Sequence, residues 1–123
     1  MSTLSYEIDG SILTLRASGP PTLSVRQPVF DAVRADATVP NQALVLLDVR
    51  EVDQVMSEYV VIERLRVLVE QLGQKLGPLC AIIVRQEHVH QARMFQQAGR
   101  GLGLRVELFG DEASARQWLK SLP

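Results

Sequence analysis

Two apolar segments constrain the fold of this chain more than any other part of its sequence. Residues 43–49 are apolar apart from Asp48, and residues 79–84 contain no charged or hydroxylated side chain. Neither segment alternates apolar with polar residues, as a strand with one solvated face would. Such runs are typical of strands covered on both faces of a parallel sheet. We therefore expect the two segments to lie side by side as interior strands, with the loops that follow them at a common edge.

Turn residues and apolar spacing predict the elements around the first of these strands. Residues 4–8 and 12–17 are β-type runs joined by Asp9-Gly10, a pair that favours a tight turn and hence a hairpin. Valines at every fourth position predict a helix whose regular part spans residues 27–35, with Pro28 in its first turn.

The longest helix is predicted over residues 57–76, where Gly77-Pro78 would end it. The remaining predicted elements are a helix over 90–98 that stops at Gly99, a strand over 104–109, and a helix over 112–122 with Asp111 as its N-cap. The resulting order is β-β-α-β-α-β-α-β-α. It predicts an α/β domain with a mixed, mostly parallel sheet of about five strands flanked by helices.

Length, composition and charge limit the classes of protein to which the chain can belong. With 123 residues, 46% of them hydrophobic and 22% charged, we expect one domain spanning residues 1–123. The net charge of −1 argues against a nucleic-acid partner. The sequence shows neither a secretory signal nor an apolar run near the about twenty residues that a membrane span requires. Because Cys80 is the single cysteine, no internal disulfide is expected, and we predict a cytoplasmic protein.

Motifs for catalysis or cofactor binding are weak. The glycine-rich segment 99–103 follows a predicted helix and precedes a strand, which is the reverse of a phosphate-binding loop. His88 and His90 have no third histidine to complete a metal site. Cys80 lies inside an apolar run, where a structural role is favoured over a nucleophilic one. We therefore predict no catalytic residues, no metal site and no cofactor.

Charge is distributed unevenly along the chain. Residues 48–63 contain five acidic residues and Arg50 as the sole basic one, a local charge of −4, whereas residues 85–105 contain four arginines and one glutamate, a local charge of +3. In open α/β sheets, partners tend to bind at the carboxyl ends of the strands. The loop 50–57 and the turn 85–88 follow the two interior strands, so we expect this edge to be the binding site.

The outer face of the predicted long helix adds apolar residues to this edge. On a helical wheel, Val60 and Val67 lie outside the inward arc, beside Arg64, and predict an exposed docking strip. The predicted partner-binding residues are Asp48, Arg50, Asp53, Ser57, Val60, Arg64 and Val67.

The end of the first apolar segment resembles the phosphoacceptor region of bacterial response-regulator receivers. In that family an aspartate ends the third strand, as Asp48 does in the tract Leu46-Leu47-Asp48-Val49-Arg50. A receiver also needs acidic residues, a hydroxyl residue and a lysine after other strands, and the corresponding positions of this chain lack them. A phosphoryl group on Asp48 would be poorly stabilised. A receiver-like phosphoacceptor is therefore the less favoured alternative.

Nearly the whole chain, from Tyr6 to Leu119, resembles the STAS domain of bacterial anti-sigma-factor antagonists and the related SpoIIAA-like proteins. The initial hairpin, the strand closing in Leu47-Asp48 and the long helix are similar to that family. So is the C-terminal stretch over residues 104–119, LRVELFGDEASARQWL. The resemblance implies the STAS fold and a non-catalytic regulatory module. It also implies a protein partner, such as a kinase-like anti-sigma factor.

The resemblance also implies a phosphorylation site. In the family's regulatory members, the partner kinase phosphorylates a serine within an Asp-Ser-Ser-Gly motif at the start of the long helix. Counted from Asp48, that motif falls on Met56-Ser57-Glu58-Tyr59, in which Ser57 alone matches. A serine at this place can cap helix amides or carry a phosphate, and the plain N-cap role is the favoured one.

Two other interpretations stay open. SpoIIAA-like proteins are grouped with lipid-carrier folds, so a carrier of a small hydrophobic ligand or lipid is the alternative function. An edge strand in a small domain would also allow a homodimer.

Overall fold

The computed structural model describes residues 2–19, 23–52 and 57–121, and it confirms the predicted order of strands and helices. The elements are β1 (Thr3–Asp9), β2 (Ile12–Ser18), α1 (Leu23–Ala35), β3 (Ala43–Glu51), α2 (Glu58–Leu72), the short 3₁₀ helix η1 (Gly73–Lys75), β4 (Leu76–Ile83), the short 3₁₀ helix η2 (Gln86–His88), α3 (Val89–Gly101), β5 (Arg105–Phe109) and α4 (Glu112–Ser121).

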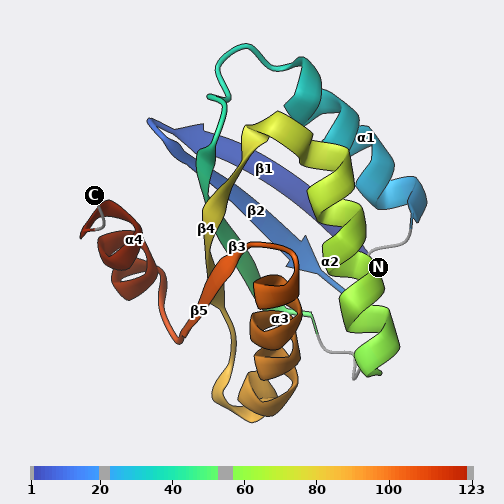
Figure 1. The fold of residues 1–123 in the computed structure, drawn as a ribbon, viewed down its shortest axis with the longest axis vertical. Coiled ribbons are helices and arrows are strands. Elements are labelled where there is room, and N and C mark those ends of the chain that lie inside the picture. Colours follow the sequence, from blue (N-terminus) through green and yellow to red (C-terminus); the bar gives the residue numbers. More distant parts are fainter. Residues whose placement is uncertain (1, 20–22, 53–56, 122–123) are drawn as a thin grey trace.

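Within the described residues, five strands form one mixed sheet in the order β1-β2-β3-β4-β5 (Figure 1). β1 and β2 form an antiparallel hairpin, and the other neighbouring strands are parallel. The two apolar segments are direct neighbours, with Leu46 opposite Ala81 and Leu47 opposite Ile82. The expectation of adjacent interior strands is therefore confirmed, and their carboxyl ends share one edge of the sheet.

Helices cover both faces of this sheet, but unequally. α1, α2 and α3 lie on one face and α4 lies on the other (Figure 1). Along β4, Ile82 packs in the core of the three-helix face and Ile83 in the core under α4, and Val45 and Leu46 alternate in the same way along β3. Because both faces are buried, successive positions are apolar, which explains the unbroken runs in the sequence.

Helix α1 begins earlier than predicted. It starts at Leu23 instead of near Gln27, so Pro28 lies inside the helix and not in its first turn. A proline has no N–H to donate to the carbonyl four residues before it, which weakens a helix at that point. Phe30 and Val33 on the same helix are buried in the core, and this packing offsets the lost hydrogen bond.

The predicted end of the long helix is wrong. α2 ends at Leu72, where Gly73 adopts a φ of 51° and donates its N–H to the Val69 carbonyl. Gly77 and Pro78 lie within β4, and Leu76 is its first residue. A Cβ atom on Gly77 would lie 2.5 Å from the Ala43 carbonyl oxygen, so this glycine permits close approach of β3 and β4.

Helix α3 also continues beyond its predicted end at Gly99, reaching Gly101. Gly99 is buried, and a Cβ atom there would lie 2.7 Å from Cγ2 of Val106 on β5. Gly99 is thus a packing residue between helix and strand. The predicted N-cap of α4 is confirmed, because the Ser114 N–H donates to Oδ1 of Asp111 at 2.8 Å.

Candidate functional site

The predicted binding edge lies where β3 and β4 end together. Asp48 on β3 is in register with Ile83 on β4. Arg50 follows two residues later on β3, and Ser57 directly precedes α2. Asp53 lies outside the described residues. The described candidates therefore divide between the end of β3 and helix α2.

Asp48 has an internal role that the sequence did not reveal. Its side chain is 10% exposed and accepts hydrogen bonds from Arg16 at 2.8 Å and from the Arg50 side chain at 3.0 and 2.8 Å. Burial by itself would raise the pKa of Asp48, but the hydrogen bonds and charge of Arg50, with Arg16, hold this pKa below its ordinary value. The carboxylate is thus engaged within the chain, which does not favour its predicted contact with a partner.

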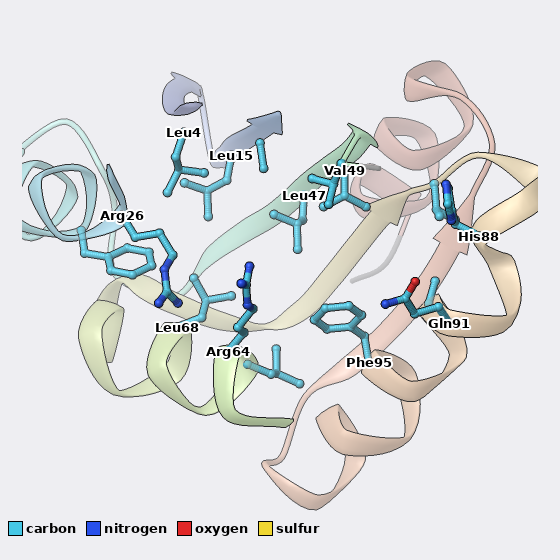
Figure 2. A pocket seen from close by; sticks show the side chains of 16 residues that line it. Leu4, Leu15, Arg26, Leu47, Val49, Arg64, Leu68, His88, Gln91 and Phe95 are labelled. Carbon is cyan, nitrogen blue, oxygen red and sulfur yellow. The ribbon is translucent and has the colours of Figure 1, made fainter. Parts of the chain in front are cut away.

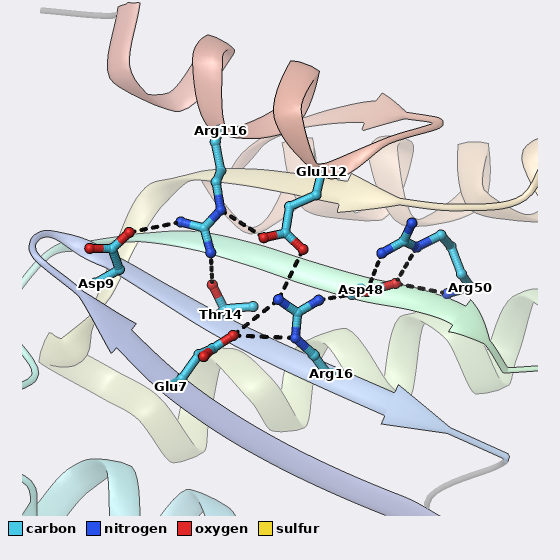
Figure 3. A network of polar contacts seen from close by, with 8 residues as sticks. All are labelled: Glu7, Asp9, Thr14, Arg16, Asp48, Arg50, Glu112 and Arg116. Atoms are coloured by element: carbon cyan, nitrogen blue, oxygen red, sulfur yellow. Dashed lines mark hydrogen bonds and ion pairs between the residues drawn. The ribbon is translucent and has the colours of Figure 1, made fainter.

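A larger ionic network surrounds this carboxylate on the α4 face of the sheet (Figure 3). Arg16 also pairs with Glu7 at 3.0 Å and with Glu112 at 2.9 Å, and Arg116 pairs with Glu112 at 2.8 Å. Arg116 further donates to the hydroxyl of buried Thr14 at 3.2 Å. These contacts attach α4 directly to β2, and Arg16 extends the network to Glu7 on β1 and Asp48 on β3. In the sequence, this network could have been recognised from Thr14 and Arg16, two polar residues at alternate positions of the otherwise apolar run over residues 12–17.

The amino end of α2 matches the prediction for Ser57. Its hydroxyl oxygen accepts a hydrogen bond from the Val60 N–H at 3.3 Å, and the side chain is exposed. Two residues later, Tyr59 is 75% exposed. The N-cap role of Ser57 is therefore confirmed.

The prediction that Val60 and Val67 form an exposed strip is wrong. Val60 and Val67 are both half-buried, and Val67 packs against the main core. Arg64 between them is half-buried as well and lies at the wall of a cavity. The inward arc of α2 is wider than the helical wheel indicated because α1 and α3 both pack beside this helix.

Cys80 lies in the sheet core, as its apolar surroundings in the sequence predict. Cys80 is buried in the core, and burial raises the pKa of its thiol to about 12, which leaves it protonated and unreactive. In the parts of the chain that the structure describes, no three acidic, histidine or cysteine side chains come together as a metal site would require.

An apolar cavity lies between α1, α2, α3 and the sheet. Its volume is about 120 Å³, and its walls include Leu15 and Leu47 from the sheet, Phe30 from α1 and Phe95 from α3 (Figure 2). Its lining is therefore mostly hydrophobic, as in many small-molecule sites.

Four polar side chains interrupt this apolar wall: the arginines Arg26 from α1 and Arg64 from α2, together with His88 and Gln91 (Figure 2). The Arg26 Nε atom is buried without a hydrogen-bond partner, and neither arginine pairs with an acidic side chain among residues 2–19, 23–52 and 57–121. Burial, together with the nearby charge of Arg26, lowers the pKa of Arg64. The sequence could have indicated that Arg26 faces inward, because it precedes buried Phe30 by four residues and so lies on the same side of the helix.

Comparison with known proteins finds solved structures of similar fold, of which two are given below. No family model and no curated protein matches the chain. An uncharacterized protein of the DUF3478 family with a SpoIIAA-like fold, from Shewanella loihica PV-4, superposes with a TM-score of 0.70 at 21% identity over 97% of this chain and 95% of that one. An anti-sigma factor antagonist from Mycobacterium paratuberculosis gives a TM-score of 0.64 at 15% identity, over 98% and 96% of the two chains.

These similarities show the fold of the chain. It is a SpoIIAA-like fold, as the sequence resemblance implies, with a five-stranded mixed sheet in the described residues. No helix in the described part of the chain has the length and apolar character needed to cross a bilayer.

Proposed function

We propose that this chain is a non-catalytic regulatory module that binds a protein partner through the amino end of α2 and the adjacent end of β3. One solved structure with this fold is an anti-sigma factor antagonist. Tyr59 carries the proposal, because it is 75% exposed and is the one large hydrophobic side chain so exposed among the described residues. Tyrosine is enriched among the residues that contribute most of the binding energy at protein interfaces.

The proposed partner is a kinase-like anti-sigma factor, and the proposed target of its kinase activity is Ser57. The Ser57 hydroxyl is exposed at the first turn of α2, where a phosphate would be stabilised by the free amides and dipole of the helix. Arg50, near the end of β3, has a half-exposed guanidinium that is paired with Asp48 on the α4 face of the sheet. Homodimerisation through an edge strand remains a separate prediction.

Replacement of Tyr59 with alanine is expected to weaken partner binding by about tenfold or more, because a large anchor side chain is removed from the interface. The measurement is quantitative recovery of the crosslinked partner by mass spectrometry from cells that express each tagged variant. Gln117→Ala is the matched control, since Gln117 is exposed on α4, across the sheet from α2. Equal loss or equal retention in the two variants would contradict the proposed surface.

A second candidate function is the binding of a small apolar ligand. The cavity between the three helices and the sheet favours it, because its walls are hydrophobic and its volume is about 120 Å³. That volume leaves no room for a lipid with two long chains.

A further inference from the structure

We propose that the cavity binds a small amphipathic carboxylate, with the apolar part of the ligand between the helices and the sheet and its carboxylate held by Arg26 and Arg64. This inference rests on the second candidate function and adds to it the chemical class of the ligand. The two arginines are called the arginine pair below.

The size of the cavity sets the apolar part of the ligand. The cavity has a volume of about 120 Å³. An engineered apolar cavity of about 150 Å³, slightly larger, binds benzene. Leu15, Leu47 and Phe95 provide an apolar lining for such a group. A single aromatic ring or an alkyl chain of about six carbons therefore matches the available space.

The arginine pair sets the charge of the ligand. Figure 2 shows the two side chains entering the cavity from α1 and α2. In the described residues neither has an acidic partner, whereas Arg16, Arg50 and Arg116 on the other face of the sheet are all paired with carboxylates. Within residues 2–19, 23–52 and 57–121 these two neighbouring cations have no counterion and one of them has a buried unpaired Nε, an arrangement that is unfavourable unless an anion completes the site.

A carboxylate has the geometry and the small size to be that anion. A guanidinium presents its N–H groups in a planar fork that binds the two oxygens of a carboxylate side by side. Two such groups converging on one apolar cavity would bind one carboxylate at the mouth and leave the hydrocarbon part inside. The shared recognition element is thus an anionic head on a short apolar body.

Hexanoate, 1-hexanol and acetate are the probes that separate these contributions. Calorimetric titration should detect hexanoate binding, and 1-hexanol of equal chain length should bind about tenfold or more weakly because it lacks the charge. Acetate should show no binding because it lacks the apolar body. In ¹H–¹³C NMR spectra of the methyl groups, hexanoate should shift Leu15 and Leu47, which line the cavity, and leave Leu119 under α4 unchanged.

Variants of the arginine pair test the assignment of the carboxylate. Arg26→Gln and Arg64→Gln should each lower hexanoate affinity by about tenfold and leave 1-hexanol affinity within about twofold. Arg93→Gln is the matched control, since Arg93 is exposed on α3 and does not line the cavity. Arg64→Lys, which keeps the charge but loses the planar fork, should lie between wild type and Arg64→Gln. Thermal unfolding of each variant checks that the fold is retained.

The outcomes separate the inference from the function on which it rests. If 1-hexanol binds as tightly as hexanoate, the cavity is a ligand site but the carboxylate inference is overturned. If neither compound binds, both the inference and the second candidate function fail. Tight hexanoate binding that is unaffected by both glutamine variants would overturn the role of the arginine pair. The comparison of the two compounds uses the wild-type chain and does not depend on the stability of any variant.

Discussion

Replacing Gly77 with alanine is expected to lower the free energy of unfolding by about 3 kcal/mol, because there is no space for a methyl group at this position. The added Cβ would lie 2.5 Å from the Ala43 carbonyl oxygen and 2.7 Å from that of Gln42. Both are backbone atoms, so no side chain can rotate to relieve the overlap. The strands β3 and β4 would have to separate at their first residues, where Ala43 is in register with Leu76.

Urea unfolding of Gly77→Ala measures this effect, and two other glycines provide its scale. A Cβ on Gly101, at the end of α3, meets no atom within 4 Å, so Gly101→Ala should be neutral or stabilise by about 0.5 kcal/mol through helix propensity. Gly99→Ala should be intermediate, because the obstructing atom is a side-chain methyl of Val106. Equal stability of Gly77→Ala and Gly101→Ala would show that β4 does not approach β3 as closely as described.

Replacing Asp48 with asparagine is expected to lower the free energy of unfolding by about 2 kcal/mol at neutral pH, because hydrogen bonds from two guanidinium groups lose their charged acceptor. Loss of one member of a fully buried ion pair would cost more. Here Arg16 and Arg50 are 36% and 37% exposed and retain contact with water, which reduces the effect.

The effect of Asp48→Asn should depend on pH with a defined sign. The native pKa of Asp48 lies below its ordinary value, so the folded state binds this proton less readily than the unfolded state does. The carboxylate's contribution is therefore fully present above the unfolded pKa of about 3.9 and is lost as pH falls through the lower native pKa. The wild-type advantage measured by urea unfolding at about pH 7 should shrink by about pH 3.

Asp31→Asn is the control for this prediction. Asp31 pairs with Arg34 on the exposed side of α1, so its loss should change stability by less than about 0.5 kcal/mol. If the two asparagine variants were equally stable at neutral pH, Asp48 would have no more than the role of a surface charge.

The strands and the order of elements could be predicted because a strand that is buried on both faces has an unbroken run of apolar residues in the sequence. The runs that became β3 and β4 have this property, and the exposed Asp9-Gly10 pair gives a separate local signal for the hairpin turn. Helix ends were harder. Gly77-Pro78 has the composition of a helix stop, yet the need for glycine there comes from the backbone of Ala43, far away in sequence.

In the candidate site, too, the features set by neighbouring residues could be predicted, and those set by distant residues could not. Ser57 could be assigned as an N-cap because a cap depends on the residues that follow it directly. The internal pairing of Asp48 depends on the register of β2 against β3, which places Arg16 opposite it. The arginine pair depends on how α1 packs beside α2, and apolar spacing within either helix contains no information about that contact.

The packing of α4 on its face of the sheet is less stable than the packing of α1, α2 and α3 on the other face. Ala115 and Leu119 are its buried core residues, Trp118 packs beside Phe109 of β5, and Glu112 and Arg116 make charged or polar contacts with β1 and β2. Salt screens such contacts, whereas the apolar packing beneath α1, α2 and α3 is retained. We therefore expect α4 to detach as a local opening unit before the strands separate, with amide hydrogens that exchange faster than those of β3 and increasingly so at high ionic strength.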